Sequence, residues 1–449
     1  MDTTAIFKAY DVRGTYPDQL NEDVARALGS AFADFVGAGP VVVARDMRPS
    51  GVSLVTAFAE GVRARGVDVV DLGLASTDFL YFASGQMNAP GAMFTASHNP
   101  AQYNGVKLTR AGAVPIGVES GLVDIQASTN AYLAAPATGA LAGYSTRDLM
   151  GAWVKHVHGF VDVGALRPIK VVADTANGMG GFIAPQVFKG LPFELEIMYE
   201  ELDGTFPNHP ADPLNPDNIV DLQRRVLEVG ADVGLAFDGD ADRVFLIDEK
   251  AQPLSGSTTT AMVAQALLRR NPGASVLYNL ICSKAVPEVI AENGGVAIRT
   301  RVGHSYIKQV MAETGAVFGG EHSGHYYFRD NYRADSGIIT ALVVLELLSR
   351  FDGPLSALVA PFQRYADSGE INTTVRNPLA SVERVAASLQ SRGVAIDRLD
   401  GLTADFGTWW FNLRASNTEP LLRLNVEAST RDELNAGVDQ ALALIKESD

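Results

Sequence analysis

The sequence predicts three consecutive α/β domains followed by a smaller C-terminal α+β domain. Three observations support this fold class. The chain has 449 residues, which suits two to four domains of ~100–200 residues each. Short β-branched runs alternate with helical stretches as far as about residue 367, a pattern typical of βα units. Beyond that position, strands and helices follow one another as in a small α+β unit.

The four domains are expected at residues 1–140, 141–250, 251–367 and 368–449. In the first domain, strands are expected at 41–44, 67–70 and 92–94, with helices at 22–36 and 52–65, and 132–144 reads as a connection. In the second, strands are expected at 169–173, 233–237 and 244–247, with a proline-rich loop at 207–216. In the third, strands are expected at 275–278, 296–299 and 316–318, with a buried helix at 338–348. In the fourth, strands are expected at 370–375, 409–413 and 421–426, with helices at 381–392 and 431–447.

The composition narrows the class of protein. A hydrophobic content of 47% is enough for a sizeable core. The net charge of −16 argues against nucleic acid or an anionic membrane as a partner. The single cysteine, Cys282, excludes an internal disulfide, and the first residues carry no secretory pattern, so a cytoplasmic location is expected. The most apolar run, at 338–348, is too short to span a membrane, and a monomer or a dimer is expected.

The segment from Thr95 to Pro100 follows a predicted strand and displays a hydroxyl, Ser97, beside the imidazole of His98. Asn99-Pro100 and Asn104-Gly105 are each expected to form a turn, which would expose Ser97 as a nucleophile. A serine at the N-cap of a helix is the alternative reading. Lys107, shortly downstream, could neutralise a phosphate or transfer a proton.

The strongest signal is the segment 238–243, in which three carboxylates alternate and an arginine follows. In an extended segment these carboxylates share one face. Two such charges ~4 Å apart repel by about 4 kcal/mol at an effective dielectric of ~20, and a divalent cation removes that cost. All-oxygen ligands favour Mg²⁺ or Ca²⁺ over zinc. The alternatives are an EF-hand, which lacks its glycine because Arg243 stands there, and a solvated acidic turn without a metal.

Two further motifs offer groups that suit a sugar phosphate. The loop from Glu321 to His325 places a carboxylate, two imidazoles and a hydroxyl between glycines, which suits sugar hydroxyls. A zinc site using its histidines is the alternative. The segment from Arg414 to Thr418 joins a guanidinium fork with small hydrogen-bonding side chains, which suits a phosphate. Taken alone, this segment also fits a surface turn.

In this order and at these separations, the four motifs resemble the α-D-phosphohexomutase family, from Tyr10 to Pro420. The Glu-x-Ser-Gly-His loop is similar to that of the phosphomannomutase/phosphoglucomutase branch, although His322 departs from its usual methionine. The resemblance implies four domains around a central cleft, each contributing one loop. The expected catalytic residues are Ser97, His98, Lys107 and Arg243, and the expected Mg²⁺ ligands are Ser97, Asp238, Asp240 and Asp242. The expected substrate-binding residues are Tyr10, Arg13, Lys284, His304, Glu321, Ser323, His325, Arg414, Ser416, Asn417 and Thr418.

The reaction implied is the interconversion of hexose 6-phosphate and hexose 1-phosphate through phospho-Ser97, with hexose 1,6-bisphosphate as intermediate and activator. Mannose phosphate is the favoured substrate, and glucose phosphate is the second choice. Lys107, with its pKa lowered by neighbouring cations, His304 and His325 are the candidates for the general base. A phosphoglucosamine mutase, a metal-dependent sugar phosphomonoesterase and a catalytically silent sensor are the alternatives.

Overall fold

A computed structural model of the chain describes residues 3–37, 39–415 and 421–447, except for the side chains of His304 and Glu447. The chain forms two compact units. The first unit consists of Met1–Ser255, Met311–Gly315 and Ser323–Leu358, and the second consists of Gly256–Val310, Ala316–His322 and Val359–Asp449. Each unit is described separately.

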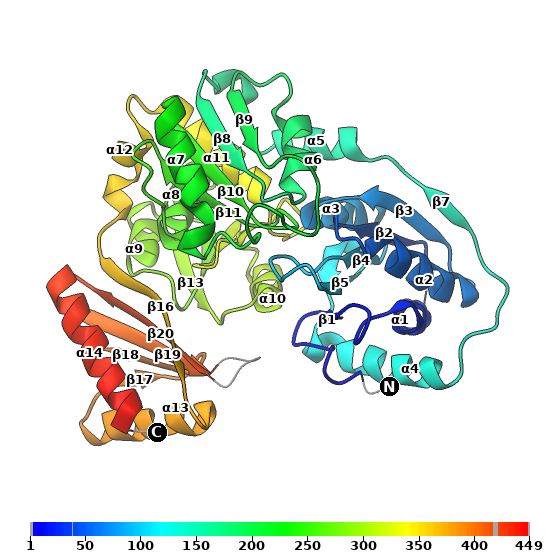
Figure 1. Cartoon of the computed structure of the whole chain (residues 1–449). Helices are drawn as coiled ribbons and strands as arrows, with labels where there is room; N and C mark the ends of the chain where they lie inside the picture. The colour runs from blue at the N-terminus through cyan, green and yellow to red at the C-terminus, as the bar shows by residue number, and fades with distance from the viewer. Residues whose placement is uncertain (1–2, 38, 416–420, 448–449) are drawn as a thin grey trace. The chain divides into compact units, whose positions relative to one another are not determined.

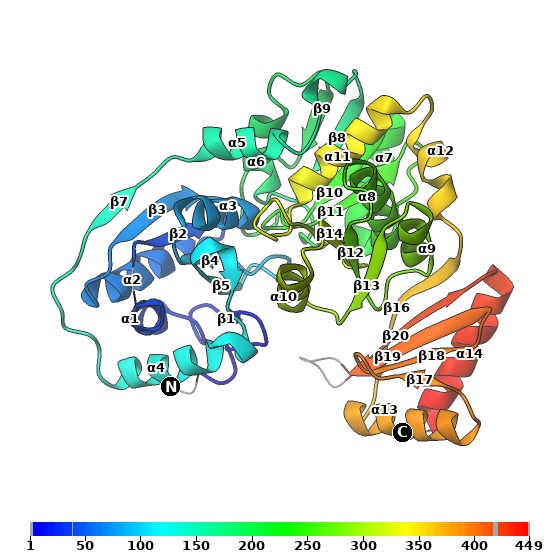
Figure 2. The same ribbon diagram turned by 180° about the vertical axis from the view of Figure 1, so that it is seen from behind.

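The first sheet of unit 1 is doubly wound. Helix α2 (Gly51–Ala64) connects β2 (Val41–Arg45) to β3 (Val69–Leu74) on one face of the sheet, where α1 (Glu22–Val36) and α4 (Leu122–Ala134) also lie (Figures 1 and 2). Helix α3 (Thr77–Met87) covers the other face. Its core contains Phe32, Phe58 and Phe94, none of which is exposed to solvent. In sheet order the strands are β1 (Val12–Thr15), β5 (Tyr103–Arg110), β4 (Gly91–Phe94), β2 (Val41–Arg45), β3 (Val69–Leu74) and β7 (Tyr144–Thr146), with β6 (Val114–Pro115) beside β5.

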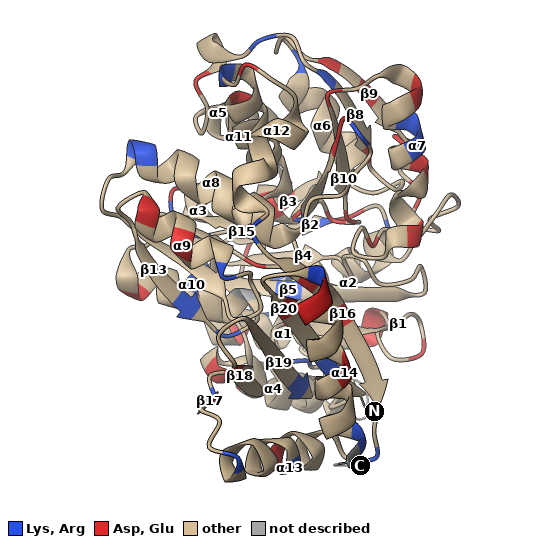
Figure 3. Cartoon of the chain, turned by 90° about the vertical axis from the view of Figure 1, so that its left-hand side faces the viewer, with Lys and Arg blue, Asp and Glu red and all other residues tan. Residues whose placement is uncertain are grey.

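The second sheet of unit 1 has the order β11 (Val244–Asp248), β10 (Val233–Phe237), β8 (Lys170–Asp174), β9 (Glu194–Met198). Strand β10 runs parallel to β8 and antiparallel to β11, so β10 and β11 form a hairpin. Helix α7 (Val220–Val229) packs on β8 and β10 and carries charges of both signs on its outer side (Figure 3). The other helices of this region are α5 (Met150–His158), α6 (Gly180–Phe188), α11 (Gly337–Arg350) and α12 (Leu355–Val359).

In unit 2, β12 (Ser275–Asn279) lies between β13 (Val296–Thr300) and β14 (Phe318–Gly320) and pairs with both in parallel. Helices α8 (Gly256–Arg270) and α9 (Ala285–Glu292) pack against each other, and α10 (His304–Thr314) begins in this unit. The next strand along the chain, β15 (Tyr326–Phe328), belongs to unit 1. Cys282 lies buried after β12, and burial raises the pKa of its thiol to about 12.

The C-terminal region of unit 2 is an antiparallel sheet with both of its helices, α13 (Pro378–Ser391) and α14 (Arg431–Glu447), in contact with each other and with its strands. Alternation along β19 (Trp409–Ala415) directs Phe411 and Leu413 toward the helices and Trp410 and Asn412 toward the other face. Helix α13 begins where Asn377 accepts a hydrogen bond from Ala380 N. The strand order is β16 (Ala366–Thr374), β20 (Leu421–Ala428), β19 (Trp409–Ala415), β18 (Leu402–Asp405), β17 (Ile396–Asp397).

The structure confirms the predicted fold class of three α/β regions and a C-terminal α+β region. The predicted strands and helices all lie on observed elements, with ends shifted by a few residues. The predicted domain boundaries and the central cleft remain predictions. Among the described residues, no helix combines the length and the apolar character that a membrane span requires.

Candidate active site

Ser97 lies in the loop that joins β4 to β5, so it does not cap a helix. Its backbone is left-handed, with φ of +50°, a conformation that non-glycine residues adopt rarely. The Thr95 hydroxyl accepts a hydrogen bond from Ser97 N at 2.9 Å and helps to hold this turn. As a result, Ser97 Oγ points toward the second sheet of unit 1 and donates to Asp238 Oδ2 at 2.7 Å.

The expected turn at Asn104-Gly105 is wrong, because both residues lie within β5. The glycine is needed there for a close approach of chains. A Cβ on Gly105 would lie 2.5 Å from Val12 O and 2.8 Å from Thr95 O. Asn104 donates from Nδ2 to Ser50 Oγ at 2.9 Å. The strand continues to Lys107, whose side chain reaches Asp240 and Asp242.

The three aspartates lie in the loop of the β10–β11 hairpin, where Ala241 is left-handed with φ of +59°. The expected extended geometry is therefore wrong, but the predicted convergence is confirmed. One oxygen from each carboxylate lies within 4.8 Å of the others. The strands on both sides exclude an EF-hand. Exposure of 0%, 0% and 1% for Asp238, Asp240 and Asp242 excludes a solvated acidic turn.

Two cations balance this buried charge. Lys107 Nζ lies 2.7 Å from Asp240 Oδ2 and 2.7 Å from Asp242 Oδ2, and Arg243 Nε lies 2.9 Å from Asp238 Oδ2. Burial acts to lower the pKa of the Lys107 ammonium, but the two carboxylates outweigh it and raise that pKa well above its usual range. The expectation that neighbouring cations lower this pKa is therefore wrong. Burial raises the pKa of Asp238 to about 7, even with Arg243 beside it.

The acidic cluster has the chemistry of a site for a divalent cation. Asp240 Oδ1 and Asp242 Oδ1 are buried and accept no hydrogen bond from the described residues. All the ligands on offer are carboxylate oxygens, with the Ser97 hydroxyl next to them. Hard cations such as Mg²⁺ prefer such ligands. The cluster could therefore hold a metal ion beside Ser97.

His325 belongs to the same neighbourhood. It forms a backbone bridge with Arg243, and its Nδ1 lies 2.8 Å from Asp335 Oδ2 and 3.8 Å from Asp242 Oδ1. Burial acts to lower the pKa of the His325 imidazole, but Asp242 and Asp335 outweigh it and raise that pKa. His325 is thus engaged by aspartates, and the described metal-ligand groups do not place it with Glu321 and His322 as the zinc alternative requires.

Two other predicted residues approach the Ser97 loop. Arg13, on β1, donates from Nη1 to Asn99 Oδ1 at 2.6 Å and pairs with Asp11. His98 is exposed, and its Nδ1 lies 3.3 Å from Ser97 Oγ. Tyr10 lies half-buried in the loop before β1. Unit 1 thus brings together Ser97, His98, Lys107, Asp238, Asp240, Asp242, Arg243, His325 and Arg13.

Three predicted residues of unit 2 have described side chains, each with local partners. Glu321 is buried and accepts from Asn279 Nδ2 at 3.2 Å and from Gly303 N at 3.1 Å. Lys284 Nζ pairs with Asp405 Oδ2 at 2.9 Å. Arg414 Nη2 pairs with Glu370 Oε2 at 3.0 Å. Ser323 is half-buried and belongs to unit 1.

Four predicted residues stand outside what the structure describes. Ser416, Asn417 and Thr418 lie outside the described residues, and so does the side chain of His304. The expected roles of these four residues therefore stay predictions.

The sequence reasoning missed three residues that contact the site. Thr77 donates to Asp240 Oδ2 at 2.5 Å, Asp335 holds His325, and the buried Arg48 donates to carbonyl groups of the Ser97 loop. Arg48 follows β2 and Thr77 follows β3, neighbouring strands of the sheet that carries Ser97. Their position after strand ends is the signal that could have singled them out.

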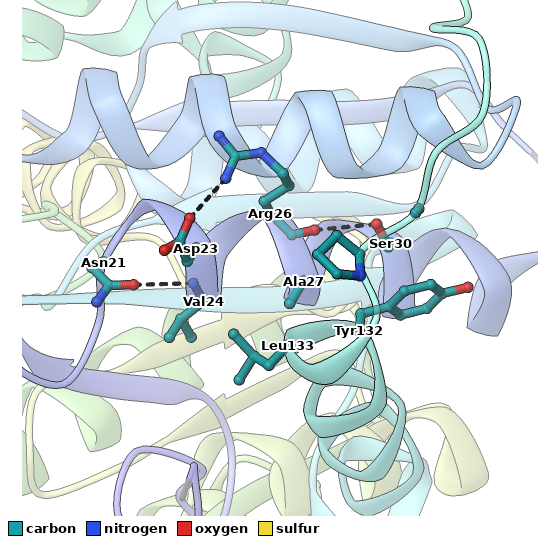
Figure 4. Close-up of a pocket in the computed structure, with 10 residues that line it drawn as sticks. Asn21, Asp23, Val24, Arg26, Ala27, Ser30, Tyr132 and Leu133 are labelled. Carbon is teal, nitrogen blue, oxygen red and sulfur yellow. Dashed lines mark hydrogen bonds and ion pairs between the residues drawn. The ribbon is translucent and has the colours of Figure 1, made fainter. Parts of the chain in front are cut away.

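A separate pocket of about 350 Å³ lies between α1 and the end of α4, away from this cluster (Figure 4). Its polar groups bond to one another or to neighbouring residues of α1 and α2, and Arg26 also pairs with Glu60 of α2 at 3.0 Å. Asn21 accepts from Val24 N at 3.1 Å, and Arg26 pairs with Asp23 at 3.1 Å. It offers no converging set of titratable groups, so the acidic cluster with Ser97 is the candidate active site.

Comparison with known proteins agrees with this site. Models for the α/β/α domains I, II and III of phosphoglucomutase/phosphomannomutase match residues 4–133, 152–252 and 255–365, and the model for the C-terminal domain matches residues 370–444. The chain is 42% identical over 427 residues to a Xanthomonas campestris pv. campestris protein named "Phosphohexose mutases", with 95% of each chain covered. It is 39% identical over 436 residues to the phosphomannomutase of Escherichia coli (strain K12), with 95% of this chain and 96% of the relative covered.

A solved structure of a family protein has the same fold. The crystal structure of a phosphoglucomutase/phosphomannomutase family protein from Burkholderia thailandensis superposes with a TM-score of 0.89 at 33% identity, covering 100% of this chain and 98% of the other. Fold and site define the class as a phosphohexomutase, which is an isomerase of hexose phosphates. The chain belongs to the phosphoglucomutase/phosphomannomutase family.

Proposed function

We propose that this phosphohexomutase interconverts hexose 6-phosphate and hexose 1-phosphate by carrying the phosphoryl group on Ser97, with mannose phosphate as the favoured substrate. One observation carries the proposal. Ser97 is 5% exposed, and its hydroxyl donates to Asp238 Oδ2 at 2.7 Å, at the edge of a buried carboxylate cluster. The phosphomannomutase name of relatives such as that of Escherichia coli supports the choice of mannose.

The reaction consists of two transfers in opposite directions. In the first, the bond between phosphorus and Ser97 Oγ breaks, a bond forms between phosphorus and the free sugar hydroxyl oxygen, and the hydroxyl proton goes to a base. The product is hexose 1,6-bisphosphate, which also serves as the activator that phosphorylates a free Ser97. After the bisphosphate turns round, Ser97 Oγ accepts its other phosphoryl group, and the sugar oxygen regains a proton.

The charges of the cluster suit this chemistry. Phosphoserine would bring about −2 to a loop that already faces three aspartates. Asp238, Asp240 and Asp242 would hold Mg²⁺ with a phosphoserine oxygen, and the ion would stabilise charge on the transferring oxygens. Arg243 Nη2 is buried and has no hydrogen-bond partner among the described residues, so it offers a free donor to a phosphate oxygen.

The remaining predicted residues would bind the sugar phosphate. Glu321 and Ser323 would read its hydroxyl groups, and Arg414 with Ser416, Asn417 and Thr418 would hold the phosphate that is not transferred. Arg414 stands directly opposite Arg423 on the neighbouring strand, and both lie beside Glu370, at 3.0 Å and 3.6 Å. Two guanidiniums sharing one carboxylate leave a positive charge for an anion. Tyr10, Arg13, Lys107, Lys284, His304 and His325 would complete the contacts.

A coupled assay tests the proposal with mannose, glucose and glucosamine 1-phosphates, in the presence of Mg²⁺ and the bisphosphate. We expect the highest kcat/KM with mannose 1-phosphate, and one phosphoryl group on Ser97 in the intact mass. Ser97→Ala should remove both turnover and phosphorylation, whereas Ser391→Ala, an exposed serine on α13, should change neither. Full activity of Ser97→Ala, or release of inorganic phosphate without the isomer, would contradict the proposal.

The proposal also places the enzyme in the cytoplasm, as a monomer or a dimer. A chain with a single cysteine has no internal disulfide to maintain, which suits a reducing compartment.

A further inference from the structure

The loop that carries Ser97 closes around a buried guanidinium. Arg48, 1% exposed, donates from Nη2 to Ser97 O at 2.9 Å and to Asn99 O at 2.6 Å. From Nη1 it donates to Pro100 O at 2.9 Å and to Tyr103 O at 2.8 Å. Four carbonyl oxygens within seven residues of one loop therefore share a single side chain.

The guanidinium is itself held in place. Asp46, which is fully buried, accepts from Arg48 N at 2.9 Å through Oδ1 and lies 3.3 Å from Arg48 Nε through Oδ2. The ring of Phe206 lies 5.2 Å from the guanidinium carbon. With the carboxylate on one edge and the carbonyl groups on the other, the plane of the guanidinium has one orientation, and the loop must match it.

We propose that Arg48 is a positioning residue, which imposes the left-handed turn at Ser97 and so aims its oxygen at the acidic cluster. The inference rests on the proposed role of Ser97 as the phosphoryl carrier. A serine with φ of +50° keeps that conformation only where its surroundings impose it. The bond from Arg48 to Ser97 O acts on the peptide group next to the strained residue.

Arg48 acts on the backbone of the loop, so its effect should fall on the transfer step. Its Nη1 and Nη2 donate to carbonyl oxygens of the loop, and its other polar contacts are with Asp46, so the contacts of Arg48 are explained without a role in binding phosphate or sugar. A loop that shifts by about 1 Å would slow an in-line transfer by about 100-fold, because the reacting atoms lose their alignment. Binding of the sugar phosphate by other residues would be little affected.

The test is Arg48→Lys, which keeps the charge but presents its donors from one nitrogen and cannot span four carbonyl oxygens. We expect kcat to fall by about 100-fold with KM within about threefold of the native value. Phosphorylation of Ser97 by hexose 1,6-bisphosphate, followed by intact mass, should slow by a similar factor.

Arg63→Lys is the matched control. Arg63 also donates to a backbone carbonyl, Ala142 O at 2.7 Å, and lies over the ring of Tyr144. Neither partner belongs to the Ser97 loop or to the acidic cluster. Arg63→Lys should lose a hydrogen bond from a guanidinium to a carbonyl oxygen, as Arg48→Lys does, and should keep the native kcat. Equal losses of kcat in both variants would mean general destabilisation and would overturn the inference.

Asp46→Asn gives a second test if Arg48→Lys does not fold. It keeps the guanidinium but weakens its anchor, and we expect kcat to fall by about 10-fold at an unchanged KM. A native kcat in a folded Arg48→Lys, or in Asp46→Asn, would overturn the inference. If the proposed function were wrong instead, the native enzyme would carry no phosphoryl group on Ser97, and its intact mass would show this.

Discussion

Lys107 shows how one residue balances the charge of the site. Its ammonium, on β5, lies 2.7 Å from two carboxylates of the acidic cluster, and all three groups are buried. Buried carboxylates without a partner are costly, so the ammonium stabilises the cluster when no metal is bound. A divalent cation would also supply positive charge to the same carboxylates.

Lys107→Met should therefore destabilise the metal-free protein strongly and the metal-bound protein less. Loss of one partner of a buried ion pair typically costs about 3–5 kcal/mol in the free energy of unfolding. Urea unfolding in EDTA and in Mg²⁺ measures both values, and Lys189→Met, at an exposed position, is the control. A loss that is equal in the two conditions would show that Lys107 and the metal do not share the same carboxylates.

His209 predicts a pH dependence of stability. Its Nε2 lies 3.0 Å from Asp174 Oδ2. Burial acts to lower the pKa of this imidazole, but the hydrogen bond and charge of Asp174 outweigh it and raise the pKa above 6.5. The folded protein therefore binds the proton more tightly than the unfolded chain does. The stabilisation is complete below pH 6.5 and is lost as the pH rises through the folded-state pKa.

His209→Gln should consequently cost about 1 kcal/mol at about pH 6 and less at about pH 9. Urea unfolding at the two pH values measures the difference. His158, whose Nε2 bonds to the carbonyl oxygen of Val187 at 2.7 Å, provides the control as His158→Gln. A larger loss at the higher pH would contradict the assigned sign.

At the scale of elements, the apolar strands could be predicted, whereas the first half of the polar strand β5 could not. Strand β10 (Val233–Phe237) is a continuous buried run, which predicts a strand directly. Strand β5 contains Asn104, Gly105 and Lys107 because it passes the Ser97 loop and supplies a cation to the site, and its polar sequence therefore predicts a turn. The sequence thus gives a wrong prediction on the strand that supplies a residue to the site.

The contact between β18 and the start of α9 predicts an effect on substrate binding. Lys284 Nζ pairs with Asp405 at the end of β18, at 2.9 Å, while we propose that Lys284 contacts the substrate. Both side chains are partly exposed, so the pair is worth at most about 1 kcal/mol. Asp405→Asn should therefore lower KM by about twofold to fivefold at an unchanged kcat.

The coupled assay with mannose 1-phosphate measures this change in KM. Asp397→Asn, which removes a similar ion pair with Arg299 nearby, should leave KM unchanged. A higher KM for Asp405→Asn would mean that the pair positions Lys284 for binding.

At the scale of the whole molecule, the aspartate cluster was predictable because its ligands are close together in the sequence. Arg48 and Asp335 were not, because each contacts the site only after distant segments come together. Arg48 meets a loop about 50 residues away, and Asp335 meets the cluster through His325. A local sequence pattern can show that Arg48 follows a strand, but it does not show which distant segment Arg48 contacts.

Metal binding should stabilise unit 1 more than unit 2. The acidic cluster belongs to unit 1, and a ligand present at 100 times its Kd stabilises what it binds by about 2.7 kcal/mol. Mg²⁺ should therefore slow hydrogen exchange in peptides covering residues 91–110 and 233–248, and much less in those covering 366–415. Asp240→Asn should remove the effect. Equal protection in all three regions would contradict a local site.

The buried thiol described above has a practical consequence. Cys282 is the one cysteine of the chain, it donates to Asn279 Oδ1, and its thiolate is scarce because of its raised pKa. Maleimide reagents attack thiolates, so the native enzyme should remain almost unlabelled. A variant such as Leu379→Cys, at a side chain that is 72% exposed, would then take up a single fluorophore without any need to remove the natural cysteine.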